Sequence, residues 1–128
     1  MKTMNASEFA KYIFNRFPEA INVTNYGTSF HVMKAGCYEI ISVWEPKSGM
    51  TKININGQSY TKMNAAEKRE AVNFIDNFEF DIVYDHDVMI DKTEKFNYVT
   101  GTFYEGQEIT VVGSNTLWRR IEKIVHVK

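Results

Sequence analysis

Three consecutive residues, Asp85, His86 and Asp87, carry side chains of the types that bind metal ions. Neighbouring residues of a strand point to opposite faces, so these side chains can converge only if the segment is a turn. His31 and His126 lie far away in the sequence, and no His-x-x-x-His spacing supports a metal centre. We therefore interpret the triplet as a solvated acidic turn and predict no metal site.

Cys37 is the single cysteine, so thiol chemistry would require it to pair with a histidine. No local signature supports such a pair, and a cysteine beside a turn and a strand is usually a small buried apolar residue. The sequence has no Gly-x-Ser-x-Gly motif and no glycine-rich loop before a helix. We predict that the chain is not an enzyme and binds no cofactor. One cysteine also excludes an intramolecular disulfide, which fits a reducing compartment.

Trp118 is followed directly by Arg119 and Arg120, and an aromatic beside arginines can stack on bases and hold phosphates. The whole chain argues against nucleic acid, because 15 basic and 16 acidic residues give a net charge of −1. The charge is uneven, since residues 1–64 hold 7 bases and 4 acids (+3) and residues 65–128 hold 8 bases and 12 acids (−4). Because of the aromatic and basic cluster at Trp118, we keep a nucleic-acid binder that uses Trp118 and the basic tail as an alternative function.

Residues 76–94 hold seven acids and one base, Lys92. An acidic surface can attract a basic partner and speed its association. We take Asp81, Asp85, Asp87 and Asp91 as candidate partner-binding residues, and we expect a protein partner with a basic surface. The acids and the basic tail could equally face each other within the fold.

Two helices are predicted by the same start signal, an Asn followed three residues later by a Glu. Asn5 with Glu8 and Asn64 with Glu67 can each form a capping box. Apolar residues then recur every three or four positions, which is typical of a helix with one buried face. Pro18 cannot continue the first helix, so we expect this helix to end just before it.

Short alternating runs between the helices predict a four-stranded antiparallel meander. The run from Cys37 to Trp44 is apolar on both faces, as in a central strand. Asn56-Gly57 between alternating runs indicates a hairpin, because both residues tolerate positive φ. The segment 59–61 is then the return strand, and we expect both helices to pack on one face of the meander.

The last third of the chain has apolar and glycine residues at regular offsets: Val88, Ile90, Val99, Gly101, Phe103, Gly106, Ile109, Val111, Trp118 and Ile121. This pattern resembles a bacterial SH3-like domain, with Val-x-Val, a Val-x-Gly-x-Leu-x-x-Gly turn, a second Val-x-Val and a Trp-x-x-Val. The resemblance implies a small β-barrel with Ile109, Val111, Trp118 and Ile121 facing one core. It also implies that aromatics at the barrel mouth bind an extended ligand, and Tyr98 and Tyr104 are the candidates here.

These patterns together predict an α+β fold: helix, four-stranded antiparallel meander, helix, then a small SH3-like antiparallel β segment. We expect units at 1–78 and 79–128, which can pack as one domain. The tail has two interpretations: Leu117, Ile121, Ile124 and Val125 fit a helical stripe, whereas the SH3-like alignment makes 117–121 a strand, which we prefer. Because the sequence ends seven residues after Ile121, we expect the barrel to be completed by the meander or by a second copy in a homodimer.

The predicted function is a small intracellular protein-binding module or inhibitor, of the style that phages and mobile elements encode against host proteins. We take Tyr98, Tyr104, Arg119 and Arg120 with the acidic residues as its candidate contact residues. No apolar signal-peptide core and no stretch of about 20 apolar residues is present, so we expect a cytoplasmic protein without a membrane partner. A cell-wall-binding module is a further alternative, as the SH3-like resemblance implies for secreted lytic enzymes.

Overall fold

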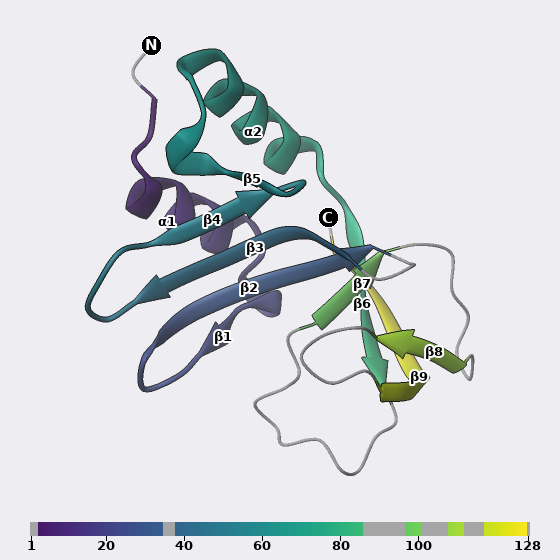
Figure 1. Cartoon of the computed structure of the whole chain (residues 1–128). Helices are drawn as coiled ribbons and strands as arrows, with labels where there is room; N and C mark the ends of the chain where they lie inside the picture. Colours follow the sequence, from purple (N-terminus) through teal and green to yellow (C-terminus); the bar gives the residue numbers. More distant parts are fainter. Residues whose placement is uncertain (1–2, 35–37, 86–96, 101–107, 112–116, 128) are drawn as a thin grey trace.

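The computed structural model describes residues 3–34, 38–85, 97–100, 108–111 and 117–127, and from residue 81 onward the backbone alone is described. Two helices flank a run of five strands, and the described elements after α2 are all strands (Figure 1). The elements are α1 (Ala6–Arg16), η1 (Pro18–Ala20), β1 (Asn22–Val23), β2 (Gly27–Lys34), β3 (Tyr38–Pro46), β4 (Lys52–Ile55), β5 (Gln58–Ser59), η2 (Tyr60–Lys62), α2 (Ala65–Asn77), β6 (Phe80–Asp85), β7 (Asn97–Thr100), β8 (Glu108–Val111) and β9 (Leu117–Val127).

Both helices begin at the predicted capping boxes. The Asn5 side chain accepts a hydrogen bond from the Glu8 backbone N–H at 2.8 Å, and the Glu8 carboxylate accepts one from the Asn5 N–H at 2.9 Å. Asn64 and Glu67 repeat this exchange at the start of α2, at 2.8 and 3.0 Å. Each box satisfies N–H groups that the first helical turn leaves unpaired, so both predicted helix starts are confirmed.

The central sheet has the strand order β1-β2-β3-β4-β5, all antiparallel, with β7 added beside β2. The predicted helix, meander and helix occur in that order, but the meander has five strands rather than four. Phe30 lies opposite Val43, which lies opposite Ile53, and these three positions form one apolar row across the sheet. Their side chains are at most 1% exposed, so this row is fully buried.

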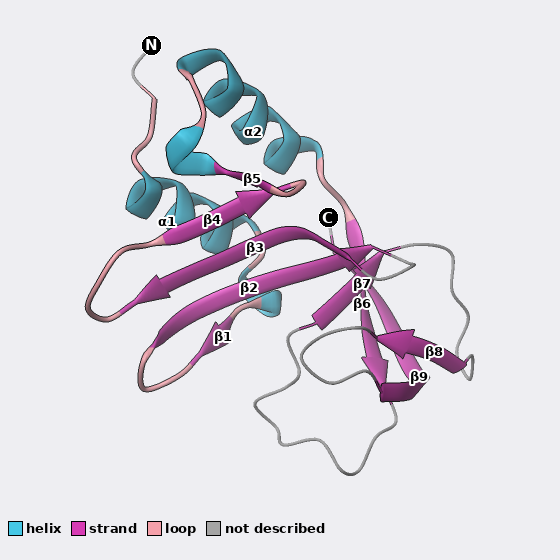
Figure 2. Cartoon of the chain, in the orientation of Figure 1, coloured by secondary structure: helices cyan, strands magenta, loops and turns pink. Residues whose placement is uncertain are grey.

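The helices α1 and α2 cover the same face of the sheet (Figure 2). Phe9 and Ile13 of α1 are completely buried, and so are Phe17 at its C-cap and Ile75 of α2. They join the sheet residues in one hydrophobic core. Each of these large side chains contributes roughly 1.5–3 kcal/mol when buried, so this one-sided core dominates the stability of the described fold. The prediction that both helices pack on one face is confirmed.

The Asn56-Gly57 hairpin is confirmed, with positive φ of 51° and 82° at its two residues. The predicted return strand over 59–61 is wrong beyond Ser59, because the chain turns into η2 there. Tyr60 explains the departure. Its ring is 1% exposed and lies 4.4 Å from the Phe9 ring, and its hydroxyl donates to the Met4 carbonyl at 2.6 Å. A continuing strand would lose this buried aromatic contact.

Four phenylalanines join the end of α2 to the sheet. The Phe80 ring lies 5.3 Å from Phe17, 5.8 Å from Phe30 and 5.6 Å from Phe78, as centroid distances. Phe80 begins β6 and is 3% exposed, so the strand that leaves the first helical unit starts inside its core. The Arg16 guanidinium closes this cluster by donating to the Phe78 carbonyl at 3.3 Å.

The C-terminal strands are only partly as predicted. The strands β6, β9 and β8 form an antiparallel sheet in that order. The tail is a strand, as we preferred, but it extends over Leu117–Val127 rather than 117–121. The predicted all-antiparallel segment is wrong for β7, which pairs in parallel with β2, from His31 opposite Asn97 to Lys34 opposite Thr100. The short strand β1 pairs only with Thr28 and Ser29, so the rest of that edge of β2 is left for another strand. An unpaired edge offers a row of free N–H and C=O groups, and β7 pairs with them.

Gly27 occupies a site that excludes a side chain. A Cβ built there would lie 2.5 Å from the Glu45 carbonyl oxygen and 2.8 Å from the Trp44 ring. We predict that Gly27→Ala lowers the free energy of unfolding by about 1–3 kcal/mol, as for other overpacked sites. Urea denaturation of the variant and the parent chain measures this loss. Gly57→Asn is the control, because nothing lies within 4 Å there and Asn tolerates positive φ; equal losses in the two variants would contradict the steric account.

The Glu67 carboxylate in the capping box of α2 should make the free energy of unfolding depend on pH. The hydrogen bond from the Asn64 backbone, followed by that from the Gln58 side chain, lowers the pKa of Glu67. A carboxylate with a lowered pKa in the folded state stabilises the protein above its unfolded pKa, and this contribution is lost as the pH falls through the folded value. We therefore expect the stability difference between the parent and Glu67→Gln to shrink from pH 6 to pH 3 in urea denaturation.

Gln58→Ala provides the internal comparison for this cap. It removes the 2.7 Å hydrogen bond to the Glu67 carboxylate and leaves the bond from the Asn64 backbone intact. Part of the acid-dependent difference should therefore persist in the Gln58→Ala background. A stability difference that is the same at both pH values would show that the Glu67 carboxylate does not stabilise the cap.

Candidate protein-binding surface

The face of the central sheet opposite the helices is not covered by any described helix or strand (Figure 1). Successive strand residues alternate between the two faces, so the register assigns the residues of this face. We call them the open face, and they come from three adjacent strands: Ser29 and His31 of β2, Ser42 and Trp44 of β3, and Lys52 and Asn54 of β4. The alternation is clearest in β4, where Lys52 and Asn54 are exposed and Ile53 and Ile55 are buried.

Trp44 lies at the middle of the open face. It pairs with Ser29 on one side and with Lys52 on the other, and its side chain is partly exposed. The Cη2 atom of its ring lies 2.8 Å from the position where a Cβ of Gly27 would be. The absence of a side chain at Gly27 therefore makes room for the indole. Ser29, directly opposite, is only 7% exposed.

His31 and Glu39 form a polar corner of this surface. The His31 Nδ1 atom lies 3.6 Å from a Glu39 carboxylate oxygen, and the two side chains are 27% and 45% exposed. The contact is an ion pair when the imidazole is protonated. Within the described residues, Nδ1 is shielded from solvent and has no hydrogen-bond partner.

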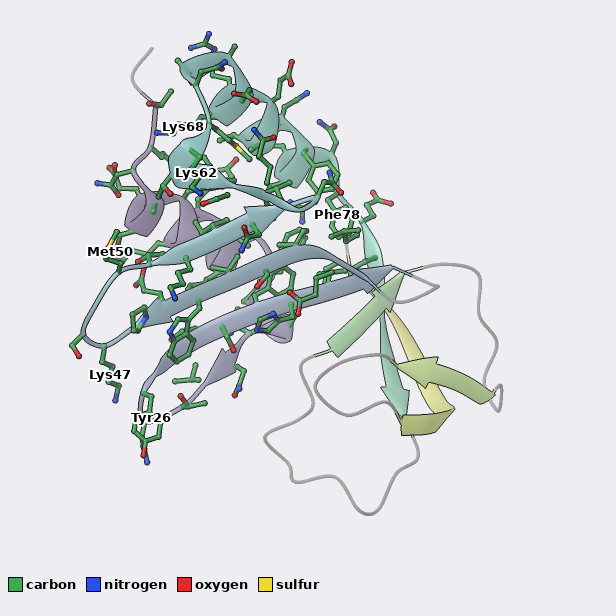
Figure 3. The ribbon with its side chains drawn as sticks, viewed as in Figure 1. Tyr26, Lys47, Met50, Lys62, Lys68 and Phe78 are labelled. Carbon is green, nitrogen blue, oxygen red and sulfur yellow. The ribbon has the colours of Figure 1, made fainter. Side chains whose placement is uncertain are left out.

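Two turns at one end of the sheet extend the surface (Figure 3). The Thr24 hydroxyl accepts hydrogen bonds from the backbone N–H groups of Tyr26 and Gly27 at 3.1 and 3.2 Å, which fixes the β1–β2 turn. The Lys47 N–H donates to the Tyr26 carbonyl at 2.9 Å and ties this turn to the end of β3. Tyr26 is 79% exposed and Met50 is 77% exposed, so an ordered pair of turns presents large apolar groups to solvent.

The residues of the open face suit contact with another molecule better than covalent chemistry. A tryptophan among serine and asparagine side chains offers apolar area together with adaptable hydrogen bonds. Among the side chains that the structure describes, no three metal-binding residues come together. In the same described part, no helix has the length and apolar character needed to cross a bilayer.

The residues predicted as contacts lie elsewhere. Asp81 and Asp85 are in β6, Tyr98 is in β7, and Arg119 and Arg120 are in β9. Asp87, Asp91 and Tyr104 lie outside the described residues, as do Cys37 and His86.

The strand pairing places several of the predicted contact residues on neighbouring strands. The strand β6 pairs with β9, so Asp81 is opposite His126 and Asp85 is opposite Ile121, one residue from Arg120. Arg120 is itself opposite Glu108 of β8. The acidic strand and the basic strand are therefore neighbours within the fold, which is the internal arrangement left open by the sequence. Tyr98 pairs with Val32 of β2, and its strand β7 also lies against β6.

Sequence reasoning missed the open face. Trp44 was assigned to a central strand with two apolar faces, although Ser42 stands two residues before it on the same face. The signal in the sequence is a polar residue at every second position of three strands. These residues form one surface only when the pairing of the strands is known. The sequence also gives no sign that the Trp44 ring lies against Gly27.

The SH3-like pattern can be followed only over part of its length. Val99 lies in β7, Ile109 and Val111 lie in β8, and Trp118 and Ile121 lie in β9. In the register, Trp118 pairs with Thr110 and Ile109 pairs with Arg119. Comparison with protein-family models, with curated proteins and with solved structures finds no match to this chain. The SH3-like resemblance therefore stays a prediction.

Proposed function

We propose that this chain is a non-enzymatic protein-binding module that uses the open face as its contact surface. The observation that carries the proposal is Trp44, which is partly exposed at the centre of the face and held in place over Gly27. Tryptophan is strongly enriched among the residues that dominate binding energy at protein interfaces. A ring that is already held in place loses little conformational freedom when a partner covers it.

The surroundings of Trp44 support a protein partner rather than a nucleic acid. The six positions of the open face include one lysine, Lys52, and one histidine, His31, with no arginine. A nucleic-acid surface requires several cations along a backbone track, and an aromatic with small polar residues is more typical of protein recognition. A stable interface buries about 800 Å² on each partner, so the contact must reach beyond Trp44 to the turns that carry Tyr26 and Met50.

We predict that Trp44→Ala weakens the affinity for a protein partner by at least about tenfold, because truncating an interface tryptophan often costs roughly 2 kcal/mol or more. Immobilised parent chain is used to capture a binding protein from the native host, and its affinity is then measured with each variant. Asn54→Glu places a charge on the open face without removing packing, and it should also weaken binding. Asn15→Glu, on the exposed side of α1, is the matched control and should bind as the parent does.

The same assay separates the open face from the acidic strand. Charge reversal at Asp81, Asp85 and Asp87 should slow association and lower its salt sensitivity only if the acidic residues contact a basic partner. A partner that tolerates both Trp44→Ala and Asn54→Glu would exclude the open face as the contact surface. Loss of binding in Asn15→Glu alone would place the contact on the helix side instead.

A further inference from the structure

A groove lies on the helix side of the molecule, between the segment that precedes α1 and the exposed side of α2. Its volume is about 260 Å³. Met4 comes from the N-terminal segment, Tyr60 from η2, and Lys68, Arg69, Val72 and Asp76 from α2. Figure 3 shows Lys68 on α2 and Lys62 beside it, and Lys62 does not line the groove. The open face is formed by other residues, so the two surfaces are distinct.

The wall and floor of the groove are fixed by buried contacts. The Tyr60 hydroxyl donates to the Met4 carbonyl at 2.6 Å, which holds the N-terminal segment against η2. Val72 and Met4 are partly buried and pack against the hydrophobic core. The Lys68 ammonium lies 5.2 Å from the centre of the Tyr60 ring, a distance at which a cation is attracted by an aromatic face. An apolar floor therefore adjoins a cation that is already positioned.

The charge at the groove is unevenly distributed. Lys68 and Arg69 are adjacent on α2, and within the described part of the chain neither forms an ion pair with a carboxylate. Asp76, two turns further along, accepts a hydrogen bond from the Tyr12 hydroxyl. Its charge is thus engaged by a donor on α1. The two cations can attract an anion to their end of the groove, while the carboxylate would repel an anion from the other end.

We propose that this groove binds a small amphipathic carboxylate, with its apolar chain on Met4 and Val72 and its carboxylate on Lys68 and Arg69. A cationic ligand would meet two like charges. A neutral apolar ligand would leave both cations without a counter-charge, and inorganic phosphate has no apolar part to cover the floor. The volume is just below the range of about 300–1,000 Å³ for drug-sized ligands, which fits a short acyl chain. This site goes beyond protein binding and does not depend on it.

Octanoate, octan-1-ol and octylammonium are suitable probes, because they share one apolar chain and differ in charge. Calorimetric titration of the full chain should show octanoate binding at least about tenfold more tightly than octanol, and octylammonium binding most weakly. In methyl NMR spectra, octanoate should shift the signals of Met4 and Val72. The double variant Lys68→Gln with Arg69→Gln should lose the preference for octanoate over octanol. Glutamine has nearly the helix propensity of lysine and arginine, so α2 should remain folded.

Lys62→Gln is the matched control, because it removes one exposed lysine outside the groove and should keep the full octanoate preference. Equal affinity for octanoate and octanol would overturn the proposal, and so would shifts confined to other methyl groups. Absence of saturable octanoate binding up to millimolar concentration would also overturn it. These results leave the open face untouched, since none of the variants changes a residue of that face.

Discussion

The one-sided burial of the central sheet is the constraint on which the rest of the structure depends. The apolar row of Phe30, Val43 and Ile53 can be removed from water only by a second layer, and α1 and α2 supply it. Two helices are enough to cover one face of a sheet of this width. The other face must therefore be polar or must contact a partner. Its serine, asparagine and lysine residues are polar, and Trp44 among them offers apolar area for a partner.

The phenylalanine cluster transmits this constraint to the C-terminal strands. Phe80 is buried against Phe17 and Phe30, so β6 starts at a fixed point beside the core. The parallel pairing of β7 with β2 makes a second connection, through His31 to Lys34. The segment after α2 is thus tied to the first sheet at two places. That arrangement agrees with an SH3-like segment only if the first sheet takes part in it.

The helices, their caps and the Asn56-Gly57 turn could be predicted from sequence because each depends on residues within a few positions of one another. Asn5 with Glu8 is such a local signal, and the structure reproduces it. The groove depends on a contact across 56 positions, from Tyr60 to Met4, and the open face depends on the pairing of three strands, such as Ser29 with Trp44. No periodicity records such contacts. The inward turn at Tyr60 was missed for this reason, because a buried aromatic contact overrode the strand pattern around it.

The edges of the central sheet explain why its face is the available contact surface. One edge of β2 is occupied by β1 at Thr28 and Ser29 and by β7 from His31 to Lys34. The opposite edge ends in β5, which has two residues before the chain turns inward at Tyr60. Short or occupied edges discourage the addition of a strand from another chain. A partner of this sheet would therefore bind across its strands, where side chains rather than backbone groups provide the contacts, and Trp44 offers the largest apolar group there. The turn at Tyr60 that ends β5 also places the Tyr60 side chain along the groove. One buried tyrosine therefore both shortens an edge of the sheet and lines the groove.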